Sequence, residues 1–526
     1  MNPQRKFIPV FLFSWAIVFG GLVRFYAAWK AGFPIVDGGM FLVMARDLQA
    51  SHYLLPVFTS YNNIQIPYAY PPLGFYLLAG INNLFGTSLL SLLQWLPAIF
   101  SALTIPAFAL LAQRILGTSS RAALATLVYG LTPQAFEWQL MGGGLTRALG
   151  ALFAILVIYF AIRMFQEKSN KMLTGTILMG ALTIYSHPEW ALQAATGGIL
   201  VWWFFGRNKP GTIRALAAAL GIIALTAPWW ASMAARHGLG IFLIASQTSQ
   251  GRLLFWWPLA TMNFSGATNI VVVGLGLIAI FICLKKKEYF LPVWVVACFL
   301  VDPRSAGHVI TIPMALLSTI SLSEMVFPWF LTIKPDSPGA GMETTMTGAF
   351  SNRLCQILLT YLFIAILIGS FSSVSSLAGF NTLQAQERQA MEWVRENTPP
   401  DSRFMVIGWV DSPWVSPLTE WFPALSERYS LTTVQGREWL PGSQNITPWI
   451  NNFEDIQSCI YQTITCVEAW SDIHAEPFDY VYISLHDPSG APGAIRLNSL
   501  YLSLSTSQNY SLVLNKPTVK IYRLRK

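Results

Sequence analysis

Long apolar segments alternate with short polar intervals along the first 380 residues of the chain. Segments long enough to cross about 30 Å of hydrocarbon lie at residues 7–27, 88–112, 121–139, 147–165, 172–187, 190–205, 212–230, 266–284, 289–301, 306–331 and 354–377. A lipid-exposed segment must satisfy its own backbone hydrogen bonds, so we expect each to be a helix. The pattern predicts a polytopic all-α membrane bundle of about 11 transmembrane helices.

The stretch from Pro72 to Gly86 is also apolar, but it is short and contains Asn82 and Asn83. Lys and Arg collect in the cytoplasmic loops of membrane proteins. If the N-terminus is inside and this stretch does not cross, the basic clusters all fall on the cytoplasmic side, among them Lys285–Lys287. We therefore predict a cytoplasmic N-terminus and an interfacial or re-entrant Pro72–Gly86. If the stretch crosses, every later loop changes sides.

The pattern changes near Phe380. From residue 384 to 526 no spanning segment occurs, and strand-like runs at 403–408, 480–485 and 519–524 alternate with helix-like runs at 384–396, 448–462 and 494–504. We predict a transmembrane domain at residues 1–380 and a soluble α/β domain at residues 381–526. An odd number of spans places the second domain outside the cytoplasm, in a multi-pass protein of the cell membrane.

Two cysteines of the predicted soluble domain, Cys459 and Cys466, are close enough in sequence to form a disulfide in an oxidising compartment. They lack the second pair that a zinc site would need.

Composition agrees with a membrane protein, since 54% of the residues are hydrophobic and 11% are charged, against roughly 25% charged in soluble domains. The net charge of +8 raises the possibility of nucleic-acid binding. However, the basic residues lie in short clusters between apolar runs, as topology determinants do. We therefore expect no nucleic-acid partner.

A polar interval follows the first apolar segment, with Asp37 in FPIVDGGMF and then Tyr68 and the run Tyr70-Pro71-Pro72. A lone carboxylate at the outer mouth of a span is costly, which makes Asp37 the first candidate for function. The predicted outer loops add Arg147 after Gly142–Gly144, His187 and Glu189 around Pro188, and Arg304 and His308 after Asp302. Polar groups from several loops thus converge on one face, while the inner loops are basic connectors.

The order of these features resembles the GT-C superfamily of membrane glycosyltransferases: an N-terminal span, an acidic residue at its outer end, an amphipathic segment, a Pro-Pro-Leu run and a many-span bundle. The superfamily includes protein O-mannosyltransferases, aminoarabinose transferases and the catalytic subunits of oligosaccharyltransferases. The resemblance implies transfer of a sugar from a polyprenyl-phosphate carrier, a membrane lipid, to a glycan, lipid or protein acceptor on the extracytoplasmic side. The Trp-Trp-Asp-Tyr-Gly signature of oligosaccharyltransferases is missing, which favours transfer of a single sugar.

Such a reaction needs a base for the acceptor hydroxyl and a cationic site for the donor phosphate. We expect Asp37 to be the general base, with inversion at the anomeric carbon in a single displacement. Arg304, assisted by His308, would neutralise the leaving phosphate, and Arg147 with Gly142–Gly144 would bind it at a helix start. Tyr68, Tyr70, Pro71, Pro72, His187 and Glu189 are the candidates for the substrate pocket.

The same residues have structural readings as well. Asp37 would cap the helix that follows it, and Asp302 would be the ion-pair partner of Arg304. Many relatives carry a second acidic residue beside the catalytic one, whereas Gly38 stands here, so a divalent metal is left open and no metal ligand is assigned.

Two other functions stay open. A transporter or flippase of a lipid-linked substrate would place ionisable residues near the bilayer midplane and often shows repeated halves. A non-catalytic membrane subunit would use its tail to bind a glycan or a partner.

Overall fold

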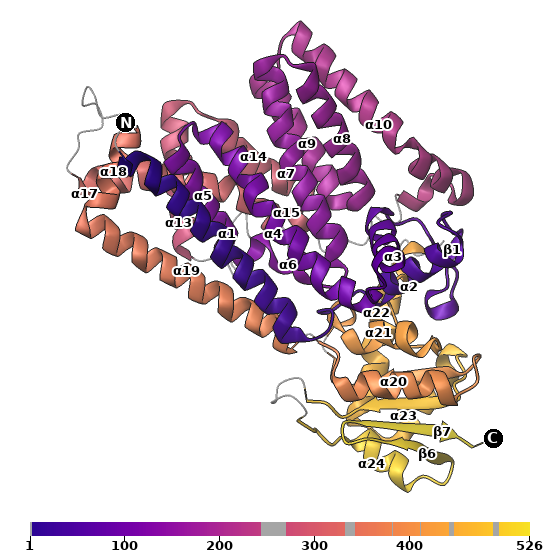
Figure 1. Cartoon of the computed structure of the whole chain (residues 1–526). Helices are drawn as coiled ribbons and strands as arrows, with labels where there is room; N and C mark the ends of the chain where they lie inside the picture. Colours follow the sequence, from indigo (N-terminus) through magenta and orange to yellow (C-terminus); the bar gives the residue numbers. More distant parts are fainter. Residues whose placement is uncertain are drawn as a thin grey trace.

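A computed structural model describes residues 3–242, 270–331, 342–380, 382–410, 412–440, 447–487 and 494–525 of the chain. Every predicted apolar segment overlaps a helix. The helices are α1 (Pro3–Ala31), α4 (Leu89–Leu116), α5 (Ser119–Leu131), α7 (Gly144–Glu167), α8 (Asn170–Ser186), α9 (Pro188–Phe205), α10 (Lys209–His237), α13 (Ile270–Lys286), α14 (Phe290–Val301), α16 (Thr311–Ser321) and α19 (Arg353–Phe380). They form an elongated bundle (Figure 1).

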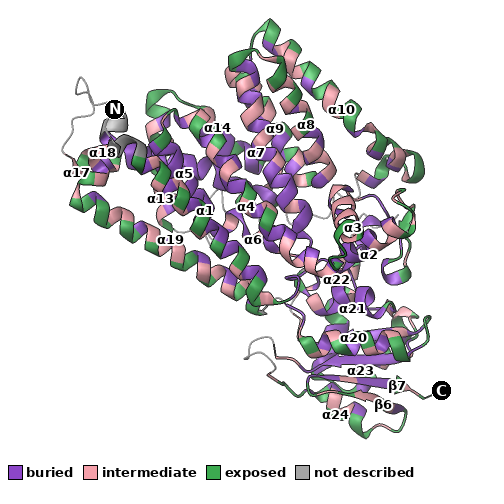
Figure 2. Cartoon of the chain, viewed as in Figure 1, coloured by how far each residue is buried: buried purple, intermediate pink, exposed green. Residues whose placement is uncertain are grey.

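Six described helices are long and apolar enough to cross a membrane. On α10, the exposed side chains Ile213, Leu216, Leu220 and Ile223 recur every three or four residues, which places them on one face. Figure 2 shows the outer faces of α10 and α19 as partly exposed, in contrast to the buried interior of the bundle. An apolar face left open in this way is suited to contact lipid. The all-α membrane bundle is therefore confirmed, and the number of 11 spans stays a prediction.

Two predicted segments are interrupted. The helix expected over residues 121–139 ends at Leu131, because Pro133 cannot continue it, and is followed by η2 (Pro133–Ala135) and α6 (Glu137–Leu140). The segment at 306–331 begins in α15 (Pro303–Val309) and continues through α16, the π-helical turn η3 (Leu322–Val326) and α17 (Phe327–Phe330). After a gap in the described residues, α18 (Met342–Ser351) follows.

The segment between α1 and α4 folds outside the long helices. It contains α2 (Gly39–Ala50), β1 (Phe58–Thr59), η1 (Tyr61–Asn63), β2 (Ile66–Pro67) and α3 (Leu73–Phe85), with β1 and β2 antiparallel. At a rise of about 1.5 Å per residue, the 13 residues of α3 span roughly 20 Å, less than the hydrocarbon thickness. This length supports the non-crossing placement of Pro72–Gly86, which stays a prediction.

The C-terminal region is α/β, as expected. Its elements are α20 (Ala385–Asn397), β3 (Arg403–Ile407), η4 (Pro413–Val415), α21 (Pro417–Ser426), β4 (Tyr429–Ser430), η5 (Arg437–Trp439), α22 (Thr447–Ser458), η6 (Cys459–Tyr461), α23 (Ile464–His474), β5 (Tyr480–Ser484), α24 (Ser499–Thr506), β6 (Tyr510–Asn515) and β7 (Val519–Leu524). The three predicted strands are confirmed. The helix expected to begin at residue 494 begins at Ser499 instead, because Asn498 caps it through its side chain.

The five strands lie in the order β4-β3-β5-β7-β6. Strand β3 runs parallel to β4 and β5, whereas β7 is antiparallel to β5 and β6. Alternate residues of β3 enter two cores. Met405 packs with α22, α23 and α24. Phe404 packs with α20, α21 and the segment between α1 and α4, which is called the outer segment below. The second core also contains Met40 and Leu42 of α2. The C-terminal region therefore shares its core with the segment that follows Asp37.

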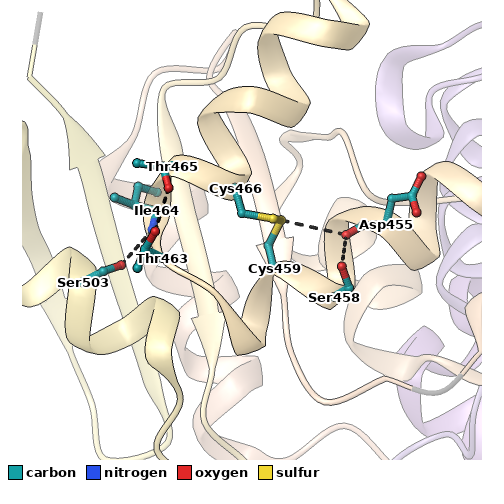
Figure 3. The surroundings of a disulfide bond; sticks show 8 residues. All are labelled: Asp455, Ser458, Cys459, Thr463, Ile464, Thr465, Cys466 and Ser503. Atoms are coloured by element: carbon teal, nitrogen blue, oxygen red, sulfur yellow. Dashed lines mark hydrogen bonds between the residues drawn. A yellow bond between two sulfur atoms is a disulfide. The ribbon is translucent and has the colours of Figure 1, made fainter.

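A disulfide joins Cys459 of η6 to Cys466 of α23 (Figure 3). Beside it, the Ser458 hydroxyl donates to the Asp455 carbonyl, and the Ile464 N–H donates to the Ser503 hydroxyl of α24. The bond thus links the turn that follows α22 to α23.

Candidate functional site

The loop between α1 and α2 carries Asp37 and is held against the start of α7. Ile35 forms a parallel bridge with Met141, and the Gly142 N–H donates to the Ile35 carbonyl at 2.8 Å. Gly38 follows at φ 125°, a conformation that side chains resist. These contacts bring two loops, more than 100 residues apart in sequence, side by side.

The Asp37 carboxylate is bound by both of its oxygens. Oδ1 accepts from the Gly143 N–H at 3.0 Å, and Oδ2 accepts from Arg147 Nη2 at 2.9 Å. The two charged side chains are only 13% and 17% exposed, so each needs the other to offset its lost hydration. Asp37 therefore does not cap α2. Its carboxylate is directed to α7.

Two of the three glycines, Gly142 and Gly143, make this close approach to Asp37 possible. A Cβ on Gly142 would lie 2.0 Å from the Asp37 carbonyl oxygen, and one on Gly143 would lie 2.7 Å from Oδ2. Their N–H groups bond to Ile35 and Asp37, and the Gly144 N–H bonds to Met141. All three N–H groups already have acceptors within the protein, and their binding of phosphate stays a prediction.

Trp138 of α6 brings three of the predicted residues together. The Arg147 guanidinium lies over its ring at 5.0 Å, and His308 stacks on it with centroids 4.9 Å apart. His187 meets the same indole edge to face at 5.3 Å. Side chains from α7, α15 and the α8–α9 junction therefore converge on one aromatic ring.

The tyrosines of the Tyr-Ala-Tyr-Pro-Pro run diverge. The Tyr70 hydroxyl lies 3.3 Å from Thr146 Oγ1, and its ring contacts His187 and Trp439. Burial raises the pKa of Tyr70 to about 12, so this phenol stays neutral at ordinary pH. Tyr68, in contrast, is fully buried and donates to the Met44 carbonyl, which directs it to α2 rather than to Asp37. Pro71 and Pro72 are buried at the start of α3.

Arg304 pairs with Glu189 at 3.6 Å, joining α15 to α9. Asp302, the alternative partner, instead accepts from the Ser305 hydroxyl at 2.5 Å. Arg304 is 44% exposed on its side chain, so it combines a positive charge with access from outside.

The sequence analysis did not single out two residues at the site, Glu420 and Trp421. Glu420 of α21 is buried, with 6% of its surface exposed. Its Oε1 accepts from the Gly38 N–H at 2.8 Å and from the Gly39 N–H at 3.1 Å. Trp421 Nε1 donates to the Val36 carbonyl at 3.1 Å. The pKa of Glu420 is held well above its usual range, first by burial and then by the nearby charge of Asp37. The C-terminal region therefore contacts the Asp37 loop directly.

The comparisons with known proteins concern both the sequence and the fold. Residues 69–231 match the family model described as dolichyl-phosphate-mannose-protein mannosyltransferase. No curated protein sequence matches the chain significantly. The structure of ArnT from Cupriavidus metallidurans bound to undecaprenyl phosphate is similar at a TM-score of 0.55 and 14% identity, covering 97% of this chain and 98% of that one. The chain has the GT-C glycosyltransferase fold.

Two other GT-C structures agree. The Archaeoglobus fulgidus oligosaccharyltransferase in complex with Zn and sulfate has a TM-score of 0.54 at 15% identity, over 90% of this chain and 68% of that one. The arabinofuranosyltransferase AftD from Mycobacteria has a TM-score of 0.59 at 14% identity, over 96% of this chain and 41% of that one. The GT-C fold and the apolar helices make this chain a multi-pass membrane protein.

The zinc in the Archaeoglobus fulgidus oligosaccharyltransferase structure raises the question of a metal here. Within the described ranges, no group of three or more His, Cys, Asp and Glu residues could hold a metal ion. Asp37 and Glu420 direct their oxygens to Arg147 and to backbone N–H groups. This donor set does not fit a divalent cation, and no step below is assigned to one.

Proposed function

We propose that the protein transfers a single sugar from a polyprenyl-phosphate carrier to an acceptor hydroxyl on the extracytoplasmic side of the membrane. The observation that carries this proposal is the Asp37 carboxylate, paired with Arg147 at 2.9 Å where the outer loops converge. The GT-C fold supports it, since the similar ArnT structure is bound to undecaprenyl phosphate. We also propose a cytoplasmic N-terminus and an extracytoplasmic C-terminal region, because this orientation puts the clusters of Lys and Arg on the cytoplasmic side.

In the proposed reaction, Asp37 accepts the proton of the acceptor hydroxyl. The acceptor oxygen bonds to the anomeric carbon, and the bond from that carbon to the phosphate oxygen breaks with its electron pair. The products are the glycosylated acceptor, with inverted configuration, and the polyprenyl phosphate. A positioned base of this kind contributes roughly 10²–10⁴-fold to the rate.

Arg147 has two roles in the proposed reaction, one toward Asp37 and one toward the donor phosphate. Its Nη2 binds Asp37, and its guanidinium lies over Trp138, beside His308. A guanidinium can contact two anions at once. We assign it the stabilisation of the ionised base before transfer and of the phosphate as charge develops on it. Arg304 completes the cationic side of the site. Burial lowers the pKa of His308 to about 4, so His308 assists there as a neutral ring. Tyr70, His187 and Glu189 line the site.

The position of these groups argues against the transporter alternative. The ionisable residues that meet around Trp138 come from helix ends and short connecting elements: α6, the first turn of α7, the α8–α9 junction and α15. Transporters bind their substrates near the bilayer midplane, between broken helices.

The test compares native cells carrying the wild-type protein, Asp37→Asn or Asp47→Asn at equal membrane abundance. Asp47 is the matched control because it lies near the other end of α2 and its carboxylate accepts hydrogen bonds from Thr59 and Ser60. We expect Asp37→Asn alone to accumulate a polyprenyl-phosphate sugar and to lose one surface glycan feature. Unchanged lipid-linked and glycan pools in Asp37→Asn would refute Asp37 as the base.

A further inference from the structure

The first turn of α2 lacks a capping side chain of its own. Gly38 occupies the N-cap position and has no side chain to accept a hydrogen bond. The free N–H groups of a helix start carry partial positive charge and need acceptors. Glu420 provides one from a point 382 residues away, because its Oε1 accepts from both Gly38 and Gly39. A side chain of the C-terminal region therefore caps the helix that begins at Gly39.

Glu420 is itself held from several sides. Its carbonyl accepts from the Tyr61 hydroxyl at 2.7 Å, and the neighbouring Trp421 binds the Val36 carbonyl. A Cβ on Gly39 would lie 2.7 Å from the Glu420 carbonyl oxygen, so only glycine permits this approach. The backbone on both sides of Asp37 is thus bonded to α21, at Val36 before it and at Gly38 and Gly39 after it.

We propose that Glu420 is a positioning residue for sugar transfer, which holds the Gly38–Gly39 backbone so that the Asp37 carboxylate stays aligned with Arg147. The inference rests on the proposed function. Misplacing a reacting group by about 1 Å can cost on the order of 100-fold in rate.

A purely structural role would anchor the C-terminal region to the outer segment without affecting Asp37. The chain offers a matched control for that role at the same interface. Asn62 donates to the Ser430 carbonyl at 3.0 Å and accepts from the Ser430 N–H at 2.7 Å. Asn62→Ala therefore removes two hydrogen bonds between the same two regions, as Glu420→Ala does, but none to the Asp37 loop.

The experiment uses the full chain in nanodiscs, with the lipid-linked sugar that accumulates in Asp37→Asn cells as donor. The kcat and the KM for donor are measured for wild type, Glu420→Ala, Glu420→Gln, Asn62→Ala and Asp37→Asn. Each variant is also checked for docking of the C-terminal region by limited proteolysis. Gln is informative because its amide oxygen can accept both N–H groups without the charge.

We expect Glu420→Ala to lower kcat by about 10–100-fold with little change in KM, Glu420→Gln to recover most of it, and Asn62→Ala to match wild type. Equal losses in Glu420→Ala and Asn62→Ala that follow undocking would overturn the positioning role, as would wild-type kcat in Glu420→Ala. If Asp37→Asn is inactive in the same preparation, such a result leaves the proposed function intact. Full activity of Asp37→Asn would remove both.

Discussion

Arg147, in the first turn of α7, lies 2.9 Å from Asp37 in the loop before α2, and neither side chain is more than 17% exposed. A buried ion pair is costly to break because removal of one partner leaves the other charge uncompensated. We therefore expect that removal of either side chain affects both the stability of the α1–α2 loop and the chemistry proposed for Asp37.

A double-mutant cycle tests that link. We expect Arg147→Gln to reduce turnover nearly as much as Asp37→Asn, since it removes both the partner of the base and a phosphate contact. The double variant should be little worse than the more damaged single variant, because residues that act as a unit are not additive. Steady-state rates with the lipid-linked donor provide the measurement. Fully additive losses would show that the two side chains act independently.

The close approach of Gly143 to Asp37 gives a second prediction. A Cβ at Gly143 would lie 2.7 Å from Asp37 Oδ2, so Gly143→Ala must displace the carboxylate or the loop. We expect loss of most activity at normal membrane abundance. Gly198→Ala on α9 is the matched control, since a Cβ there meets nothing within 4 Å. Wild-type turnover in Gly143→Ala would mean that the observed Asp37 geometry is not required.

The sequence predicted that polar groups of several loops converge on one face, but it did not predict the individual contacts. Apolar length predicted the bundle, and short strand-like runs predicted β3, β5 and β7, because these patterns are local. Arg147 was assigned to phosphate, whereas the structure pairs it with Asp37. Such a contact between distant loops leaves no periodic trace.

Glu420 shows the same limit more sharply. It lies in a short helix among Leu418, Trp421 and Phe422, where a lone acidic residue is typical of a solvent-facing position. Its burial depends on the N–H groups of Gly38 and Gly39, which lie in a distant part of the chain. The one available signal was Gly38-Gly39 itself, a helix start without a capping side chain.

The stability of the C-terminal region should depend on pH through Glu438. Burial raises the pKa of this carboxyl from 4.5 to about 7, opposed in part by Arg304. The folded protein then binds the proton more tightly than the unfolded chain does. The contribution is therefore fully present below about pH 4.5 and is lost as the pH rises through about 7. Such a shift corresponds to on the order of 3 kcal/mol.

Melting temperatures of the full chain in detergent between pH 4.5 and pH 8 provide the check. Glu438→Gln keeps a neutral side chain of the same shape, so its melting temperature should fall less with rising pH than that of wild type. A residual fall is expected, because burial also raises the pKa of Glu420 and Glu387. Identical slopes for the two proteins would contradict the assignment to Glu438.

The cysteines report the side of the membrane on which the C-terminal region lies. Cys459 and Cys466 are joined in that region, whereas Cys283, Cys298 and Cys355 are buried thiols of the helical bundle. After mild reduction of intact cells, a membrane-impermeant maleimide should label the wild-type protein but not Cys459→Ser/Cys466→Ser. Labelling of wild type only after permeabilisation would place the region in the cytoplasm. That result would also separate Asp37 from an extracytoplasmic acceptor, because Glu420 and Trp421 hold the Asp37 loop on the same side as the disulfide.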